Sequence, residues 1–135
     1  MSIIHLGKHS FQTLVAITPE EHSMGLMHKP WPPPVMVFPY NKAEERKFWM
    51  KNTISPLDIV FCRDNKIVDI CYGEPMSTKL IGPNEPSDMV IELPFGTVHA
   101  HQLKRGDPIK FAPSKEIIGK DIGRLFREIS GRISK

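Results

Sequence analysis

The chain has 135 residues, of which 40% are hydrophobic and 24% charged, so it has the composition of one soluble globular domain, which excludes a disordered or membrane-spanning protein. Its two cysteines are too few for a disulfide framework or a four-cysteine zinc site, and residues 1–10 lack the features of a signal peptide, so we expect a cytoplasmic protein. The net charge of +3 belongs to the C-terminal end, because residues 1–110 hold 12 basic and 12 acidic residues. A near-neutral body argues against a large phosphate-binding surface.

Thirteen prolines and nine glycines divide the sequence into short segments, which predicts a mainly β fold. Residues 11–18 form the first expected strand. A helix over residues 19–26 follows, because Thr18 is placed to cap it and a proline and two acids come next. A stiff proline-rich connector at 30–34 then leads to a strand at 35–38, a charged loop at 41–47 and a strand at 47–52.

The next segment predicts a β-hairpin, with strands at 57–63 and 66–72 joined by Asp64 and Asn65. A two-residue turn pairs Phe61 with Val68 and Cys62 with Ile67. This register places both cysteines on one face, too far apart along the ladder for a disulfide. A strand at 89–93, a short helix at 97–103 capped by Thr97, and a strand at 109–111 complete the body.

The C-terminal segment from residue 114 predicts a basic amphipathic helix, so we divide the chain into a body of residues 1–112 and a tail of residues 113–135. The apolar side of this helix holds Ile118, Ile122, Leu125, Phe126, Ile129 and Ile133, and its basic side holds Lys120, Arg124 and Arg127. The helix can dock on its own domain, pair with a second copy, or contact a protein partner, nucleic acid or a membrane surface.

Three segments carry a resemblance to a known family: Met-Gly-Leu-Met at 24–27, Phe-Trp-Met-Lys-Asn-Thr at 48–53 and Pro-Leu-Asp-Ile-Val-Phe at 56–61. Together with Val-Ile-Glu-Leu-Pro at 90–94 and Gly-Asp at 106–107, they resemble the domain of unknown function 192 over roughly residues 14–110. The resemblance implies a small, mainly β protein of bacterial, archaeal or viral origin, with two packed sheets in a sandwich or jelly-roll-like arrangement. The family supplies no established activity.

The main candidate site is the most family-like segment, where Trp49, Lys51, Asn52, Thr53 and Asp58 combine polar and aromatic groups. If residues 48–52 form a strand, these groups can line a shallow ligand pocket. The alternative is structural: Asn52 and Thr53 close a turn, and Asp58 stabilises that turn or pairs with Lys51.

Glu92 lies inside an apolar strand, where we expect it to face solvent, with Lys51 as an available partner. If it instead shares a cleft with Asp58, the two carboxylates can divide acid and base roles or hold a metal. The six histidines form no recognisable metal motif, and both cysteines are expected to be buried hydrophobic side chains, so no metal or cofactor is expected.

The sequence therefore favours a non-catalytic binding module for a small ligand or a partner. Two alternatives remain: a small hydrolase or lyase that uses Asp58 and Glu92, and a structural protein that oligomerises through the C-terminal helix.

Overall fold

The structure is a computed structural model that describes residues 1–118. In this part of the chain the strands are β1 (Ile3–Leu6), β2 (His9–Val15), β3 (Val35–Glu45), β4 (Leu57–Arg63), β5 (Lys66–Gly73), β6 (Pro86–Pro94) and β7 (Ile109–Ala112). The helices are α1 (Pro19–Met24), α2 (Thr97–Ala100) and α3 (Lys115–Ile118). The mainly β fold is confirmed.

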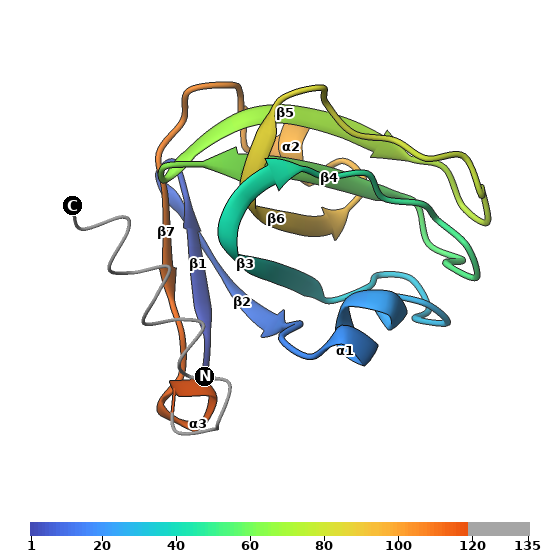
Figure 1. Cartoon of the computed structure of the whole chain (residues 1–135), viewed down its shortest axis with the longest axis horizontal. Coiled ribbons are helices and arrows are strands. Elements are labelled where there is room, and N and C mark those ends of the chain that lie inside the picture. Colours follow the sequence, from blue (N-terminus) through green and yellow to red (C-terminus); the bar gives the residue numbers. More distant parts are fainter. Residues whose placement is uncertain (119–135) are drawn as a thin grey trace.

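The strands form one sheet in the order β5-β4-β6-β3-β2-β1-β7. Only the β2–β3 pair among them is parallel, and the other neighbours are antiparallel. The sheet curls strongly, so that β1 and β7 lie side by side and run at a steep angle to β4 and β5 (Figure 1). Strand β1 is absent from the expectations above because residues 1–10 carry no clear alternation.

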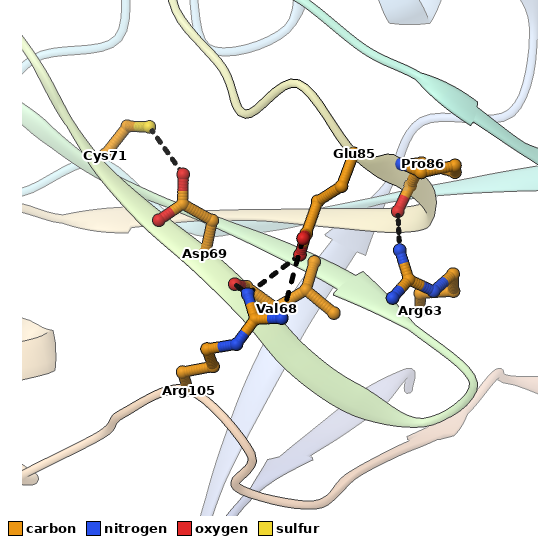
Figure 2. A network of polar contacts seen from close by, with 7 residues as sticks. All are labelled: Arg63, Val68, Asp69, Cys71, Glu85, Pro86 and Arg105. Atoms are coloured by element: carbon orange, nitrogen blue, oxygen red, sulfur yellow. Dashed lines mark hydrogen bonds and ion pairs between the residues drawn. The ribbon is translucent and has the colours of Figure 1, made fainter.

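The curl is nearly closed where the β4–β5 hairpin meets the loop before β7. The N–H of Ile67 donates to the Asp107 carbonyl at 3.0 Å, and the N–H of Ile109 donates to the Asn65 carbonyl at 2.9 Å. Arg105 donates to the Val68 carbonyl and forms an ion pair with Glu85 at 2.8 Å (Figure 2). These contacts hold the two ends of the sheet together.

Apolar side chains cover both faces of the sheet. Inside the curl, residues of β1 and β7 such as Ile4 and Ile109 pack against Val60 and Ile91 of the central strands. The outer face holds a second apolar cluster, which contains Leu26, Phe38, Met50, Leu57, Ile59, Phe61, Val68 and Val90. Residues after α1 and between β3 and β4 therefore form a layer over the outer face.

Helix α1 begins as predicted. The Thr18 hydroxyl accepts a hydrogen bond from the Glu21 N–H at 3.1 Å, and the Glu21 carboxylate accepts one from the Thr18 N–H at 2.9 Å. This reciprocal capping box satisfies two backbone donors that the first turn leaves unpaired. Helix α2 differs from the prediction, because its N-cap is Gly96 and the Thr97 hydroxyl donates to the Pro94 carbonyl.

The hairpin is confirmed, but its register is not. Cys62 pairs with Ile67 as predicted, whereas Phe61 pairs with Asp69 because β5 has a bulge at Val68. A one-residue shift exchanges the two faces of a strand. Cys71 therefore packs against the outer cluster while Cys62 belongs to the inner one, and the prediction that they share a face was wrong.

Two segments between β3 and β4 also differ from the prediction. The charged residues expected in a loop extend β3 as far as Glu45. The strand predicted at 47–52 does not form. In its place Phe48 makes a single bridge to Ile81, with N–H···O bonds of 2.8 Å in both directions. A longer ladder would place Arg46 opposite Pro83, which has no N–H to donate.

The predicted C-terminal helix begins at the expected boundary. Ser114 precedes α3, and its hydroxyl accepts a hydrogen bond from the Ile117 N–H at 3.3 Å. Ile118 is the last described residue, and the other tail residues named above lie outside the described part of the chain. Within residues 1–118, no helix has the length and apolar character that crossing a membrane requires.

Candidate functional site

A cavity of about 480 Å³ lies on the outer face of the sheet. It is bounded by α1 and the residues that follow it, by Phe38 and Tyr40 of β3, and by residues 45–49. Glu92 of β6 lies at its base and is only 4% exposed. The volume is in the range of small-molecule sites, which are concave and mostly apolar with a few polar groups.

Glu92 is the most unusual group in the cavity. Among residues 1–118 no hydrogen bond or ion pair to its carboxyl is found, and burial alone shifts its pKa. Burial raises the pKa of Glu92 to about 8, because the charged form loses its hydration with no compensating partner. The expectation that Glu92 faces solvent was wrong, and at neutral pH the empty cavity presents a protonated carboxyl.

Gly25 allows the chain to pass close to this carboxyl. It ends α1 with φ at +48°, in the left-handed region that favours glycine. A Cβ atom here would lie 3.6 Å from Glu92 Oε1 and 3.5 Å from Phe38 Cζ. The backbone after α1 and the Phe38 ring therefore enclose the carboxyl from two sides.

Aromatic rings form much of the cavity wall. Phe38 and Phe48 meet edge to face with centroids 5.3 Å apart, and His22 meets Tyr40 in the same way at 5.0 Å. Trp49 lines the cavity and is 44% exposed, so its indole reaches the solvent side. A ligand would meet ring faces and edges on several sides.

His22 reaches the cavity from α1. Its Nε2–H donates to the Ala16 carbonyl at 2.8 Å, which fixes the tautomer because a carbonyl can only accept. Burial lowers the pKa of His22 below its ordinary value, so the ring is neutral at pH 7. In this tautomer Nδ1 is an acceptor, and no hydrogen bond to it is found among residues 1–118.

Arg46 is the first of two cations at the cavity. Its guanidinium lies 3.7 Å from the centroid of the Tyr40 ring, a cation–π contact. It also donates to the carbonyl oxygens of Lys42 and Ser87 and forms an ion pair with Glu44 at 3.4 Å. These contacts fix Arg46 against β3 and β6.

Lys47 is the second cation. Its ammonium donates to the carbonyl oxygens of Gly82 and Pro83, at 2.7 and 3.1 Å, and to Asn84 Oδ1 at 2.9 Å. It also lies 3.6 Å from a Glu45 carboxylate oxygen. Since an ammonium has three N–H donors, protein acceptors use all of them.

The residues predicted from the 48–53 segment separate into two groups. Trp49 and Thr53 line the cavity, whereas Lys51 and Asn52 do not. Lys51 Nζ lies 5.2 Å from the centroid of the exposed Trp49 ring. Asn52, with φ at +56°, belongs to a turn closed by a 3.0 Å hydrogen bond from the Thr53 N–H to the Met50 carbonyl.

The structure does not bring Asp58 and Glu92 into one cleft. Ile59 pairs with Glu92 in the β4–β6 ladder, so their side chains share a face, and Asp58 projects from the opposite face. Asp58 Oδ2 accepts hydrogen bonds from the N–H groups of Gly96 and Val98, at 3.1 and 2.9 Å. Its carboxylate stabilises the start of α2. Over residues 1–118, no three His, Cys, Asp or Glu side chains are grouped as metal ligands.

Comparison with known proteins gives a family. The model of the DUF192 family, described as uncharacterized ACR, COG1430, matches residues 2–111. The chain belongs to this family. No curated protein matches it.

Two solved structures are similar to this chain in fold and sequence. A protein of unknown function from Novosphingobium aromaticivorans DSM 12444 is 27% identical, with a TM-score of 0.74, over 80% of this chain and 83% of that one. A candidate transcription regulator from Sinorhizobium meliloti 1021 is 29% identical, with a TM-score of 0.76, over 82% and 94% of the two chains.

Three of the five segments that carry the DUF192 resemblance meet at the cavity. Residues 24–27, Phe48, Trp49 and Thr53 line it, and Glu92 comes from the family-like segment at 90–94. Sequence reasoning missed His22, Tyr40 and Arg46. His22 lies three residues before the Gly-Leu-Met sequence, but nothing local shows that its ring packs against Phe38 and Tyr40 of β3.

Proposed function

We propose that this DUF192 protein is a non-catalytic module that binds a small molecule in the cavity above Glu92. The observation that carries the proposal is the buried Glu92 carboxyl, which faces the cavity with no partner in the described part of the chain. A buried polar group without a partner is costly and needs an explanation, and a titratable group with a shifted pKa in a cleft is a candidate functional group.

The composition of the wall supports binding. Leu26, Phe38 and Phe48 can bury the body of a ligand, and Glu92 and His22 can orient it through hydrogen bonds. The alternative hydrolase or lyase requires two carboxylates on one substrate. Asp58 lies on the opposite face and is held by backbone N–H groups, so the geometry favours binding.

A ligand screen tests this proposal. The screen measures the melting temperature in the presence of amines, alcohols, carboxylates, sugars and nucleotides. We expect only the class that binds to raise the melting temperature, because a ligand that binds only the folded state stabilises it. A Trp31→Phe variant leaves Trp49 as the single indole, and its fluorescence reports binding at the cavity itself.

Two variants localise any ligand that the screen finds. Glu92→Gln keeps the shape of the side chain but removes its acidity, and it should weaken binding. Glu74→Gln removes an exposed carboxylate outside the cavity and should leave binding unchanged. Ligands that stabilise the protein equally in both variants, with no change in Trp49 fluorescence, would contradict the proposed site.

A further inference from the structure

We propose that the ligand of this cavity carries a protonated amine, which binds the Glu92 carboxylate while its apolar body lies among the aromatic rings. This inference rests on the proposed function and names the chemical class of the ligand. The inference depends on a difference between the charged groups around the cavity: some already have protein partners and one does not.

The hydrogen-bond acceptor at the base of the cavity, the Glu92 carboxyl, is available to a ligand. Glu92 has no donor among residues 1–118, and it lies at the base of the cavity beside the Phe38 ring. A carboxylate of this kind is completed by an N–H or O–H donor from a ligand, and a cationic donor gives the stronger, charge-assisted hydrogen bond.

The cationic donors at the cavity, Arg46 and Lys47, already bind protein oxygens. All three N–H groups of Lys47 bond to protein oxygens, and Arg46 is held by carbonyl oxygens and an ion pair. An anionic ligand would have to displace these contacts and would meet the Glu92 carboxyl as well. The cavity therefore favours a cation over an anion.

The rings favour the same ligand. Phe38, Phe48 and Trp49 come from β3 and the segment after it, and all three line the cavity that contains Glu92. Aromatic faces attract ammonium groups through the ring quadrupole, and this attraction grows when both partners are desolvated. A carboxyl at the base of an aromatic wall combines both modes of recognition in one place.

Binding of an ammonium should be linked to the proton on Glu92. The ligand ammonium would pair with the ionised carboxylate, so at pH values where the empty site is protonated the proton leaves Glu92 for solvent. The other groups facing this space are His22 from α1, Tyr40 and Glu45 from β3, and Arg46 and Lys47 from the segment beyond it. His22 is neutral at pH 7, burial raises the pKa of Tyr40, and the remaining three are held in ion pairs.

The expected pH dependence is steep. With the pKa of Glu92 at about 8, its ionised fraction rises from about 1% at pH 6 to about 50% at pH 8. Affinity for an ammonium that stays protonated over this range should therefore rise by about 50-fold.

Three probes of similar shape test the inference: benzylammonium, benzyl alcohol and benzoate, titrated calorimetrically at pH 6, 7 and 8. We expect benzylammonium to bind at least about 10-fold more tightly than the other two at pH 8, the range of a charge-assisted contact. Only its affinity should rise with pH, and two buffers of different ionisation enthalpy should show proton release at pH 6.

Glu92→Gln should remove both the preference for benzylammonium and its pH dependence, while Glu74→Gln should retain them. The pH profile of the unmodified protein is an independent measure, so the test does not depend on how well a variant folds. Benzyl alcohol or benzoate binding as tightly as benzylammonium, with Trp49 fluorescence responding, would overturn the amine and leave the binding function intact. Binding of none of the three would also overturn it, and the broader ligand screen then decides the proposed function separately.

Discussion

Asp58 and Glu92 lie next to each other in the β4–β6 ladder but project from opposite faces of the sheet. Both are buried, and burial raises the pKa of each. Their surroundings differ, because backbone N–H groups bind the Asp58 carboxylate while Glu92 faces a cavity without a partner. The sheet therefore separates one structural carboxylate from one that is available to a ligand.

Asp58→Ala should destabilise the protein without changing the cavity. The Asp58 carboxylate accepts from Gly96 and Val98 and takes the place of a side-chain cap on α2, and loss of such a cap costs about 1–3 kcal/mol. Urea unfolding measures the loss. Asp58→Asn keeps one acceptor oxygen and should lose less, and ligand affinity at Glu92 should be the same in both. Unchanged stability in Asp58→Ala would contradict this structural role.

Glu92 should make the folded state less stable as the pH rises. Its pKa is about 8 in the folded protein against 4.5 for the unperturbed group, so between these values the folded state holds a proton that the unfolded state has lost. The contribution of Glu92 is therefore fully present below pH 4.5 and is lost as the pH rises towards 8, at about 1.4 kcal/mol per pH unit.

The Glu92→Gln variant isolates this pH dependence, because the glutamine side chain cannot ionise. The difference in unfolding free energy between the variant and the unmodified protein should grow by a few kcal/mol from pH 5 to pH 8. Urea unfolding of both proteins across this range measures it, and the other titrating groups cancel in the difference. A difference that does not change with pH would show that Glu92 ionises freely in the folded state.

Some of the fold can be predicted because its signals are local. The Thr18 capping box lies within four residues, and the hairpin turn uses Asp64 and Asn65, whose φ values of +52° and +63° suit these residue types. The register of β5 cannot be predicted in this way. Its bulge places the Val68 carbonyl against Arg105, 37 residues further along the chain.

The candidate site could be predicted only in part for the same reason. Trp49, Thr53 and Glu92 stand out in the sequence, but whether a strand glutamate faces solvent or a cavity depends on what packs over it. Here the cover is Gly25 and the chain after α1, which lie more than 60 residues away in sequence. Asp58 was a wrong candidate because its partners are backbone N–H groups, and the sequence does not show which backbone groups a side chain will meet.

Gly82→Ala should disturb the wall of the cavity. Gly82 has φ at +149°, and a Cβ atom there would overlap the Arg46 carbonyl oxygen. The segment that carries Phe48 would have to move away from Ile81, which should cost about 1–3 kcal/mol and weaken ligand binding. Gly106→Ala is the matched control, because its φ of +92° is also positive but no atom lies within 4 Å of the added Cβ. Equal losses in the two variants would show that strain at φ, and not the overlap, is responsible.

The two free cysteines should differ in reactivity. Burial raises the pKa of both thiols, to about 11 for Cys71 and further for the fully buried Cys62. The Cys71 thiol also donates to the Asp69 carboxylate at 3.7 Å, which opposes formation of a second negative charge (Figure 2). Since the thiolate is the reactive form, iodoacetamide at pH 8 should label Cys71 about 100-fold more slowly than an unperturbed thiol and should not label Cys62 while the protein is folded.

Asp69→Asn tests the contribution of the carboxylate to this difference. Removing its charge should lower the pKa of Cys71 and speed its labelling, whereas Asp64→Asn, in the exposed hairpin turn, should leave the rate unchanged. Mass spectrometry of the labelled peptides follows each cysteine separately. Because Cys62 belongs to the inner cluster, its labelling requires the curled sheet to open, and its rate should not exceed the rate of unfolding. Labelling of Cys62 at the same rate as Cys71 in the folded protein would contradict the placement of the two thiols on different faces of the hairpin.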